Sequence, residues 1–134
     1  MRLFPEPLFQ GVESASRMQI LHWWEARRLN YNLYLGVVGV ATWLLVLFAG
    51  SAAVKPGVDF EEPLGMLVGP FVYGFMANLC YTLGSVIDIA IYQRSPRVAL
   101  FKIGLFCSIG LTALPGLWAV TAWLTTVVTG NKFD

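Results

Sequence analysis

The sequence has little charge for its length. Only 13% of its 134 residues are Asp, Glu, Lys or Arg, which is about half the share that soluble domains carry. The formal net charge is +1, so no electrostatic basis exists for binding nucleic acid. Together with 57% hydrophobic residues, the shortage of charge indicates that a bilayer is the solvent for most of the chain.

Groups that bind metals or form disulfides are also scarce. The two cysteines, Cys80 and Cys107, lie within apolar runs, so we expect buried thiols rather than a disulfide framework. The single histidine, His22, has Glu25 three residues away, but a transition metal needs three or four protein ligands. One histidine also excludes a haem held by two histidines of one chain. We therefore predict no metal site and no cofactor.

Catalytic groupings are missing as well. The sequence contains no Gly-rich phosphate loop, no nucleophile elbow and no paired acids within an apolar run. Ser85 and Ser108 have no base near them in the apolar stretches. An intramembrane enzyme is thus the weakest of the functions that we consider, and we predict that the protein is not an enzyme.

Three long apolar stretches dominate what is present. They cover residues 33–54, 64–92 and 98–129, and each is long enough to cross a bilayer as a helix. The third exceeds what a core of about 30 Å requires, and Pro115 marks where it should kink or break. The part after Pro115 would complete the crossing, lie in the interface or return as a short fourth crossing. We predict an all-α, polytopic membrane protein with three transmembrane helices in residues 33–130.

The N-terminal region differs from these stretches. Residues 1–15 contain Pro5, Pro7 and Gly11 and predict an irregular arm. Residues 16–32 predict a helix, opened by a capping box of Ser16 and Gln19, that lies at the membrane surface or runs on into the first span. The expected interfacial anchors here and in the second loop are Trp23, Trp24, Arg27, Arg28, Arg94 and Arg97.

The basic residues predict the orientation in a cell membrane. Arg17, Arg27 and Arg28 precede the first span, and Arg94 and Arg97 follow the second, whereas the loop between these spans is acidic. The positive-inside rule places the N-terminus in the cytoplasm. With three crossings, the C-terminus lies outside.

The second span carries a polar face. Asn78, Tyr81, Ser85 and Asp88 follow Gly74 at alternating steps of four and three, so they share one side of a helix. One interpretation is a proton or cation site lined by these four polar side chains, because a carboxylate within a span is a functional hypothesis by default. We favour a structural interpretation, since Asp88 lies near the cytoplasmic end, where basic residues can pair with it.

Small residues on the second and third spans predict where helices pack. They allow close approach of backbones, and polar side chains among them can bond between helices. We expect a contact between these two spans, or alternatively a seam between copies of the chain. The predicted packing residues are Gly65, Gly69, Gly74, Asn78, Gly104, Ser108 and Thr112.

These features predict a small, non-catalytic membrane subunit that packs against and stabilises a larger membrane protein complex. Its partners would be membrane lipid and other membrane protein subunits, or copies of itself, and no nucleic acid. The alternative is a homo-oligomeric channel or transporter that uses the polar face of the second span and Asp88.

Overall fold

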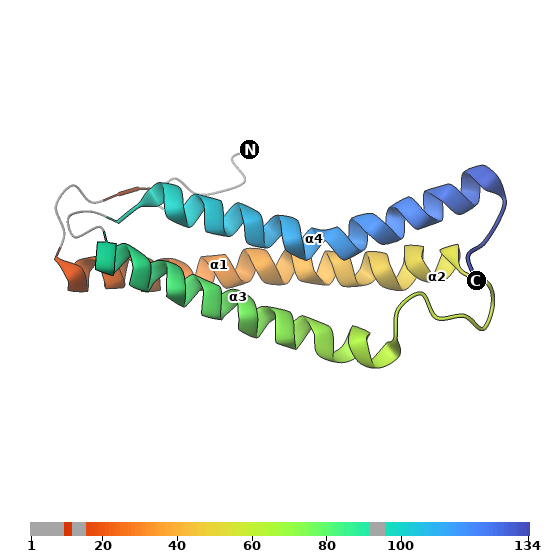
Figure 1. Cartoon of the computed structure of the whole chain (residues 1–134), viewed down its shortest axis with the longest axis horizontal. Helices are drawn as coiled ribbons and strands as arrows, with labels where there is room; N and C mark the ends of the chain where they lie inside the picture. The colour runs from red at the N-terminus through yellow and green to blue at the C-terminus, as the bar shows by residue number, and fades with distance from the viewer. Residues whose placement is uncertain (1–9, 12–15, 92–95) are drawn as a thin grey trace.

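Three long helices account for most of the described chain (Figure 1). The computed structural model describes residues 10–11, 16–91 and 96–134; most of the predicted N-terminal arm, and Arg94 in the second loop, lie outside these residues. Each long helix is apolar and long enough to cross a membrane. The predicted fold class is confirmed: the protein is an all-α membrane protein with three spans. The long helices are α1 (Arg17–Leu45), α3 (Pro63–Ile91) and α4 (Val98–Thr129).

The first helix joins two predicted elements. The capping box forms as predicted, with the Ser16 amide donating to Gln19 Oε1 at 2.8 Å and the Gln19 amide donating to Ser16 Oγ at 3.3 Å. No proline or glycine separates residues 16–32 from the first span, so the helix runs on. It continues through η2 (Val46–Gly50), a π-helical turn, and α2 (Ser51–Ala53). The predicted surface helix and the first span are therefore parts of one continuous helix.

The third span is a single helix with a bend. α4 passes through Pro115 without interruption, and Figure 1 shows it bending near its middle. The predicted break is thus a kink, and the residues after it continue the same helix rather than returning as a separate one. Gly116 follows the proline, and a Cβ atom there would lie 3.2 Å from the Thr42 Cα of α1. Glycine at this position therefore allows α4 to approach α1 closely.

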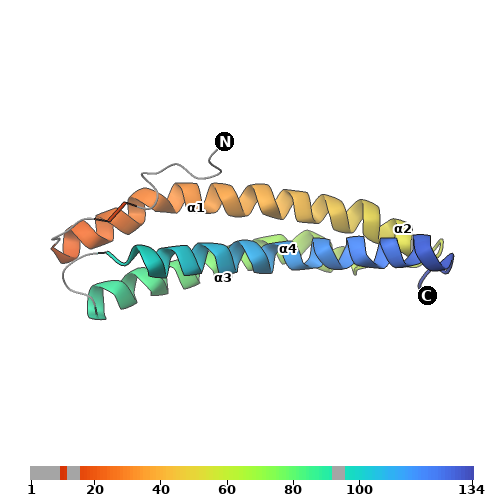
Figure 2. The same cartoon turned by 90° about the horizontal axis from the view of Figure 1, so that it is seen from above.

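The three helices form a bundle around α1. Figure 1 shows α1 between α3 and α4, and Figure 2 shows α3 and α4 together on one side of it. At one end the three helices share a core of aromatic and aliphatic side chains. Toward its first turns, α3 diverges from the other two helices (Figure 1). The buried core lies at the end opposite to this divergence, and its members are Ile20, Trp23, Trp24, Tyr31, Leu35, Ala77, Tyr81, Phe101 and Leu105.

The C-terminal residues fasten the divergent end. Phe133 pairs with the backbone that follows α2: its amide donates to Ala53 O, and its carbonyl accepts from the Lys55 amide, both at 3.0 Å. Lys55 and Asp134 also form an ion pair. Gly50 in the π-helical turn leaves room for the Phe60 ring, which a Cβ would approach to 2.5 Å. These contacts hold α1, α4 and the first loop together where α3 leaves them.

Candidate functional site

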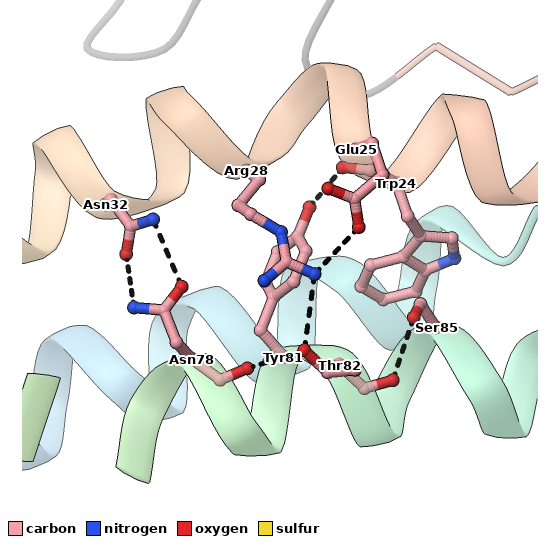
Figure 3. A network of polar contacts seen from close by, with 8 residues as sticks. All are labelled: Trp24, Glu25, Arg28, Asn32, Asn78, Tyr81, Thr82 and Ser85. Carbon is pink, nitrogen blue, oxygen red and sulfur yellow. Dashed lines mark hydrogen bonds and ion pairs between the residues drawn. The ribbon is translucent and has the colours of Figure 1, made fainter. Parts of the chain in front are cut away.

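Polar side chains gather between α1 and α3 at the well-packed end of the bundle. We call this group the polar seam, and Figure 3 shows most of it. Trp24, Arg28 and Asn32 are spaced four residues apart on α1, so they form a stripe on one side of that helix. The stripe faces the polar side of α3 that the sequence predicts. The seam consists of Trp24, Glu25, Arg28, Asn32, Asn78, Tyr81, Thr82, Ser85 and Asp88.

Asp88 is fully buried, with 0% of its surface exposed. Its Oδ2 atom accepts two hydrogen bonds, from Trp24 Nε1 at 2.8 Å and from the Arg97 amide at 3.0 Å. Oδ1 is also buried and accepts no hydrogen bond from the described residues. The carboxylate thus ties the end of α3 to α1 and to the N-terminus of α4, where helix amides favour negative charge.

Aromatic rings enclose this carboxylate. The Tyr81 hydroxyl donates to Trp24 O at 2.5 Å, and the two rings meet edge-on with centroids 5.2 Å apart. Phe101 of α4 lies edge-on to Trp24 at 5.7 Å. Such pairs add about 0.5–1.5 kcal/mol each beyond the burial of their area. The three helices are therefore fixed to one another around Asp88.

Arg28 bridges α1 and α3 beside this cluster. Its Nη2 atom donates to Glu25 Oε1 at 2.7 Å and to Thr82 Oγ1 at 3.2 Å. Its guanidinium carbon lies 5.1 Å from the centre of the Tyr81 ring, within the range of a cation–π contact. Its Nε atom is buried and donates to none of the described residues. The charge is thus compensated locally by Glu25.

Asn32 and Asn78 form a reciprocal pair deeper in the bundle. Asn32 Nδ2 donates to Asn78 Oδ1 at 3.1 Å, and Asn78 Nδ2 donates to Asn32 Oδ1 at 2.7 Å. Asn78 Nδ2 also donates to Gly74 O at 3.0 Å. Hydrocarbon cannot form hydrogen bonds with an amide, so each asparagine side chain supplies a donor and an acceptor to the other. The pair joins the middle parts of α1 and α3.

Ser108 of α4 bonds with two tyrosine hydroxyl groups, one from α1 and one from α3. The Tyr31 hydroxyl lies 2.8 Å from Ser108 Oγ and 3.3 Å from Ala77 O. The Tyr73 hydroxyl donates to Ser108 O at 2.9 Å. Ser108 therefore takes part in packing, but its partners are tyrosines of α1 and α3 rather than small residues.

The glycines predicted to pack do not touch another helix. A Cβ atom built at Gly69, Gly74 or Gly104 would find no neighbouring atom within 4 Å, and at Gly65 it would meet only Glu62 Cβ at 4.0 Å. The expected contact of α3 with α4 through these residues is therefore not formed within the chain. The long polar side chains of α3 reach α1 instead, because α1 offers groups that can bond with them.

Thr112 and Ser85 are buried and bond within their own helices. Thr112 Oγ1 donates to Ser108 O at 2.6 Å, and Ser85 Oγ donates to Thr82 O at 2.8 Å. Such bonds satisfy a hydroxyl without a partner on another helix. Ser85 thus lies next to Asp88 in the seam but does not bind it.

Two of the predicted interfacial anchors face the core. Trp23 is 5% and Trp24 2% exposed, so their rings contact protein rather than headgroups. The reason is that their indole N–H groups find acceptors within the chain: Trp23 Nε1 donates to Gln10 O at 2.7 Å. Arg27 stacks 4.0 Å from the Trp23 ring centre. That this end of the bundle lies at headgroup depth stays a prediction.

The cysteines correct a further expectation. Cys80 and Cys107 are free and exposed on the helix surfaces, so the prediction of buried thiols was wrong. An apolar run indicates burial in a bilayer, not burial within the chain. Among the residues that the structure describes, no group of three His, Cys, Asp or Glu side chains is placed to hold a metal ion.

Sequence reasoning found the α3 half of the polar seam and missed the α1 half. Trp24, Arg28 and Asn32 form the missed stripe, and Tyr31 adds the bond to Ser108. Their spacing of four was visible in the sequence, but two of them were assigned to the membrane surface. Pairing this stripe with the polar face of α3 would have predicted the seam.

Comparison with known proteins gives one partial similarity. The chain is 28% identical over 95 residues to the Na(+)/H(+) antiporter NhaA of Bartonella bacilliformis, which covers 69% of this chain and 21% of the antiporter. The chain thus spans about a fifth of the length of that relative. No family model matches the chain, and no solved structure does. The similarity agrees with the three apolar helices in indicating a protein of the cell membrane.

Proposed function

We propose that the protein is a small, non-catalytic membrane subunit that packs against other membrane-spanning helices and stabilises their assembly. The observation that carries this proposal is a contrast between hydrogen-bonded polar side chains and a glycine that contacts no other helix of the chain. The long polar side chains of α3 bond to α1, whereas Gly104 of α4 has open space beside it. Small residues let helix backbones approach closely in a membrane.

The surface of the bundle supports the same proposal. In the most apolar window of each span, only 17–22% of residues are buried within the chain. The remainder must face lipid or other proteins. On α4, Gly104 and Cys107 are three residues apart and share one side of the helix. Both are exposed, so this side is suited to contact with a neighbouring helix.

Cys107 makes this proposal testable in native membranes. A Cys80→Ser variant keeps Cys107 as the single reactive thiol, and a short thiol-reactive photo-crosslinker would capture what lies beside it. We expect a defined protein adduct, identified by mass spectrometry. Adding Gly104→Leu should abolish it, because the side chain would block close approach. The matched control is Gly36→Leu on α1, which also has open space but lies on another helix.

The crosslinking result either supports or contradicts a subunit contact. A discrete adduct that is lost with Gly104→Leu and kept with Gly36→Leu supports a subunit contact, and its mass tells whether the neighbour is another protein or a second copy. Labelling of lipid alone, with no protein adduct in either background, would contradict the proposal.

A second candidate function is proton or cation transport through Asp88. Two observations favour it: the similarity to part of a Na(+)/H(+) antiporter, and a buried carboxylate whose Oδ1 atom accepts no bond from the described residues. Carboxylates within spans occur in proton relays and ion pathways. In this function the carboxylate would exchange a proton or bind a cation at Oδ1 while Oδ2 keeps its two donors.

Flux measurements test this candidate. The protein would be reconstituted into vesicles, and proton-coupled Na⁺ uptake would be followed with a pH-sensitive dye. Transport through Asp88 requires that Asp88→Asn abolish uptake while the variant still folds. Absence of uptake in the unmodified protein, or equal uptake in both, would remove Asp88 from transport.

A further inference from the structure

A groove opens where α3 diverges from α1. Its volume is about 780 Å³, and its lining comes from α1, α3, the first loop and the middle of α4. The lining is mainly apolar, with Trp43 on α1, Gly65 and Gly69 on α3, and Thr112 and Pro115 on α4. The groove begins beside Glu61 and ends at Asn32, whose amide is already bonded to Asn78.

The dimensions of the groove limit what can fill it. Its lining on α1 runs from Asn32 to Val46, roughly 21 Å along a helix axis. A hydrocarbon chain is narrower than a helix with its side chains, which is about 10–12 Å across, because its atoms contact their neighbours at about 3.5–4.0 Å. A lipid tail therefore fits along the groove.

The wall formed by α3 carries Gly65, Gly69 and Gly74 among larger side chains. Gly69 lies in its middle, with no atom within 4 Å of where its Cβ would be. Trp43 spans the opening near the first turns of α3, with Nε1 donating to Met66 O at 3.2 Å. This bond joins the two walls at that point, and the mainly apolar lining favours apolar contents.

The mouth of the groove is acidic. Glu61 lines it, and Asp59 and Glu62 lie in the same loop with exposed side chains. None of these three forms an ion pair with a described residue, and the nearby Lys55 is paired with Asp134. This uncompensated negative charge favours a headgroup that carries an amine and disfavours an anionic one.

We propose that the groove binds a phospholipid with an ammonium headgroup, such as phosphatidylethanolamine, with one acyl chain along Gly65 and Gly69 and the amine beside Glu61. The proposal is independent of the subunit function. It treats the lipid as a specific ligand that fills the divergent end of the bundle, distinct from the lipid that surrounds every span.

Native mass spectrometry of the full-length protein tests this binding. The probes are dioleoyl phosphatidylethanolamine and dioleoyl phosphatidylglycerol, supplied in equal amounts before transfer to a mild detergent. We expect one retained lipid per chain and a preference for phosphatidylethanolamine of about fivefold, the ratio that one charge near a headgroup supports. Glu61→Gln should bring the two lipids to parity, and Glu61→Lys should invert the preference.

Groove-filling variants test the position of the acyl chain. Gly69→Leu should lower lipid retention strongly, because its side chain would project into the groove. Gly110→Leu, outside the groove lining but with equal space, should retain lipid as before. If Gly69→Leu fails to fold, the Glu61 variants still test lipid binding, because the Glu61 side chain is exposed in a loop.

Three results would overturn the proposal. The first is the same ratio of the two lipids in the unmodified protein and both Glu61 variants. The second is equal retention in Gly69→Leu and Gly110→Leu. The third is an efficient disulfide between two chains carrying Gly69→Cys and Cys80→Ser and Cys107→Ser, which would place a second copy in the groove.

Discussion

The two ends of the bundle are built in different ways. At one end, α1 and α3 are joined by bonds from Asp88, Arg28 and the Asn32–Asn78 pair, and aromatic rings fill the space between helices. At the other end, α3 diverges and leaves a groove of about 780 Å³. In a bilayer, hydrocarbon competes equally for apolar side chains, so bonds and close packing decide where helices stay together. The bonded end is therefore the part that holds the fold.

The largest effect should come from removing the buried carboxylate. Asp88→Ala leaves Trp24 Nε1 and the Arg97 amide without their acceptor, and each unsatisfied buried donor costs about 1–3 kcal/mol. We expect a loss of about 2–4 kcal/mol in the free energy of unfolding in detergent micelles. Asp88→Asn is the control, because its amide oxygen still accepts and should lose much less. Equal losses in the two variants would contradict this role of Asp88.

A second variant sharpens the comparison by disturbing the contact of α4 with α1 at the divergent end. Gly116→Leu places a side chain where a Cβ already lies 3.2 Å from Thr42 Cα. Overpacking of this kind costs about 1–3 kcal/mol. Gly104→Leu, with open space, should have little effect on thermal unfolding. A destabilised Gly104 variant and an unaffected Gly116 variant would reverse the assignment of close helix contacts.

The asparagine pair should contribute less than Asp88. We expect Asn78→Ala to lower the free energy of unfolding by about 0.6–1.7 kcal/mol, the range measured for bonds between membrane helices. Asn32→Ala should cost nearly the same, and the double variant little more than either one. Costs that simply add in the double variant would show that the two amides do not depend on each other.

The smallest effect should occur in the groove. Gly69→Ala meets no neighbouring atom, and alanine is favoured over glycine within a helix by up to about 1 kcal/mol. We therefore expect unchanged or slightly raised thermal stability. A clear loss would mean that α3 packs closely at Gly69, and the contrast between the two ends would no longer hold.

The sequence predicted the spans well because length and apolarity determine them. It also identified the polar face from Asn78 to Asp88 by its spacing. We predicted that this face packs against α4, at Gly104 and Ser108, because small residues commonly mark helix contacts. Long polar side chains need hydrogen-bond donors and acceptors on the facing helix more than they need room. Trp24 and Asn32 of α1 supply these groups.

Three further features lay beyond sequence reasoning. Whether a glycine is covered by a helix depends on crossing geometry, so Gly69 and Gly116 looked alike in sequence but differ in the structure. Likewise, the sequence did not predict that α3 diverges from α1 toward its first turns (Figure 1). The position of Trp24 in the core depended on finding its acceptor 64 residues away.

A double-mutant cycle between Trp24 and Asp88 tests the central claim most directly. Unfolding free energies would be measured for Trp24→Phe, Asp88→Ala and the double variant. If the polar seam holds the bundle, Trp24→Phe should cost about 1–2 kcal/mol less when Asp88 is already replaced, because its indole N–H then has no acceptor to lose. Additive costs, with no coupling between the two residues, would contradict the claim.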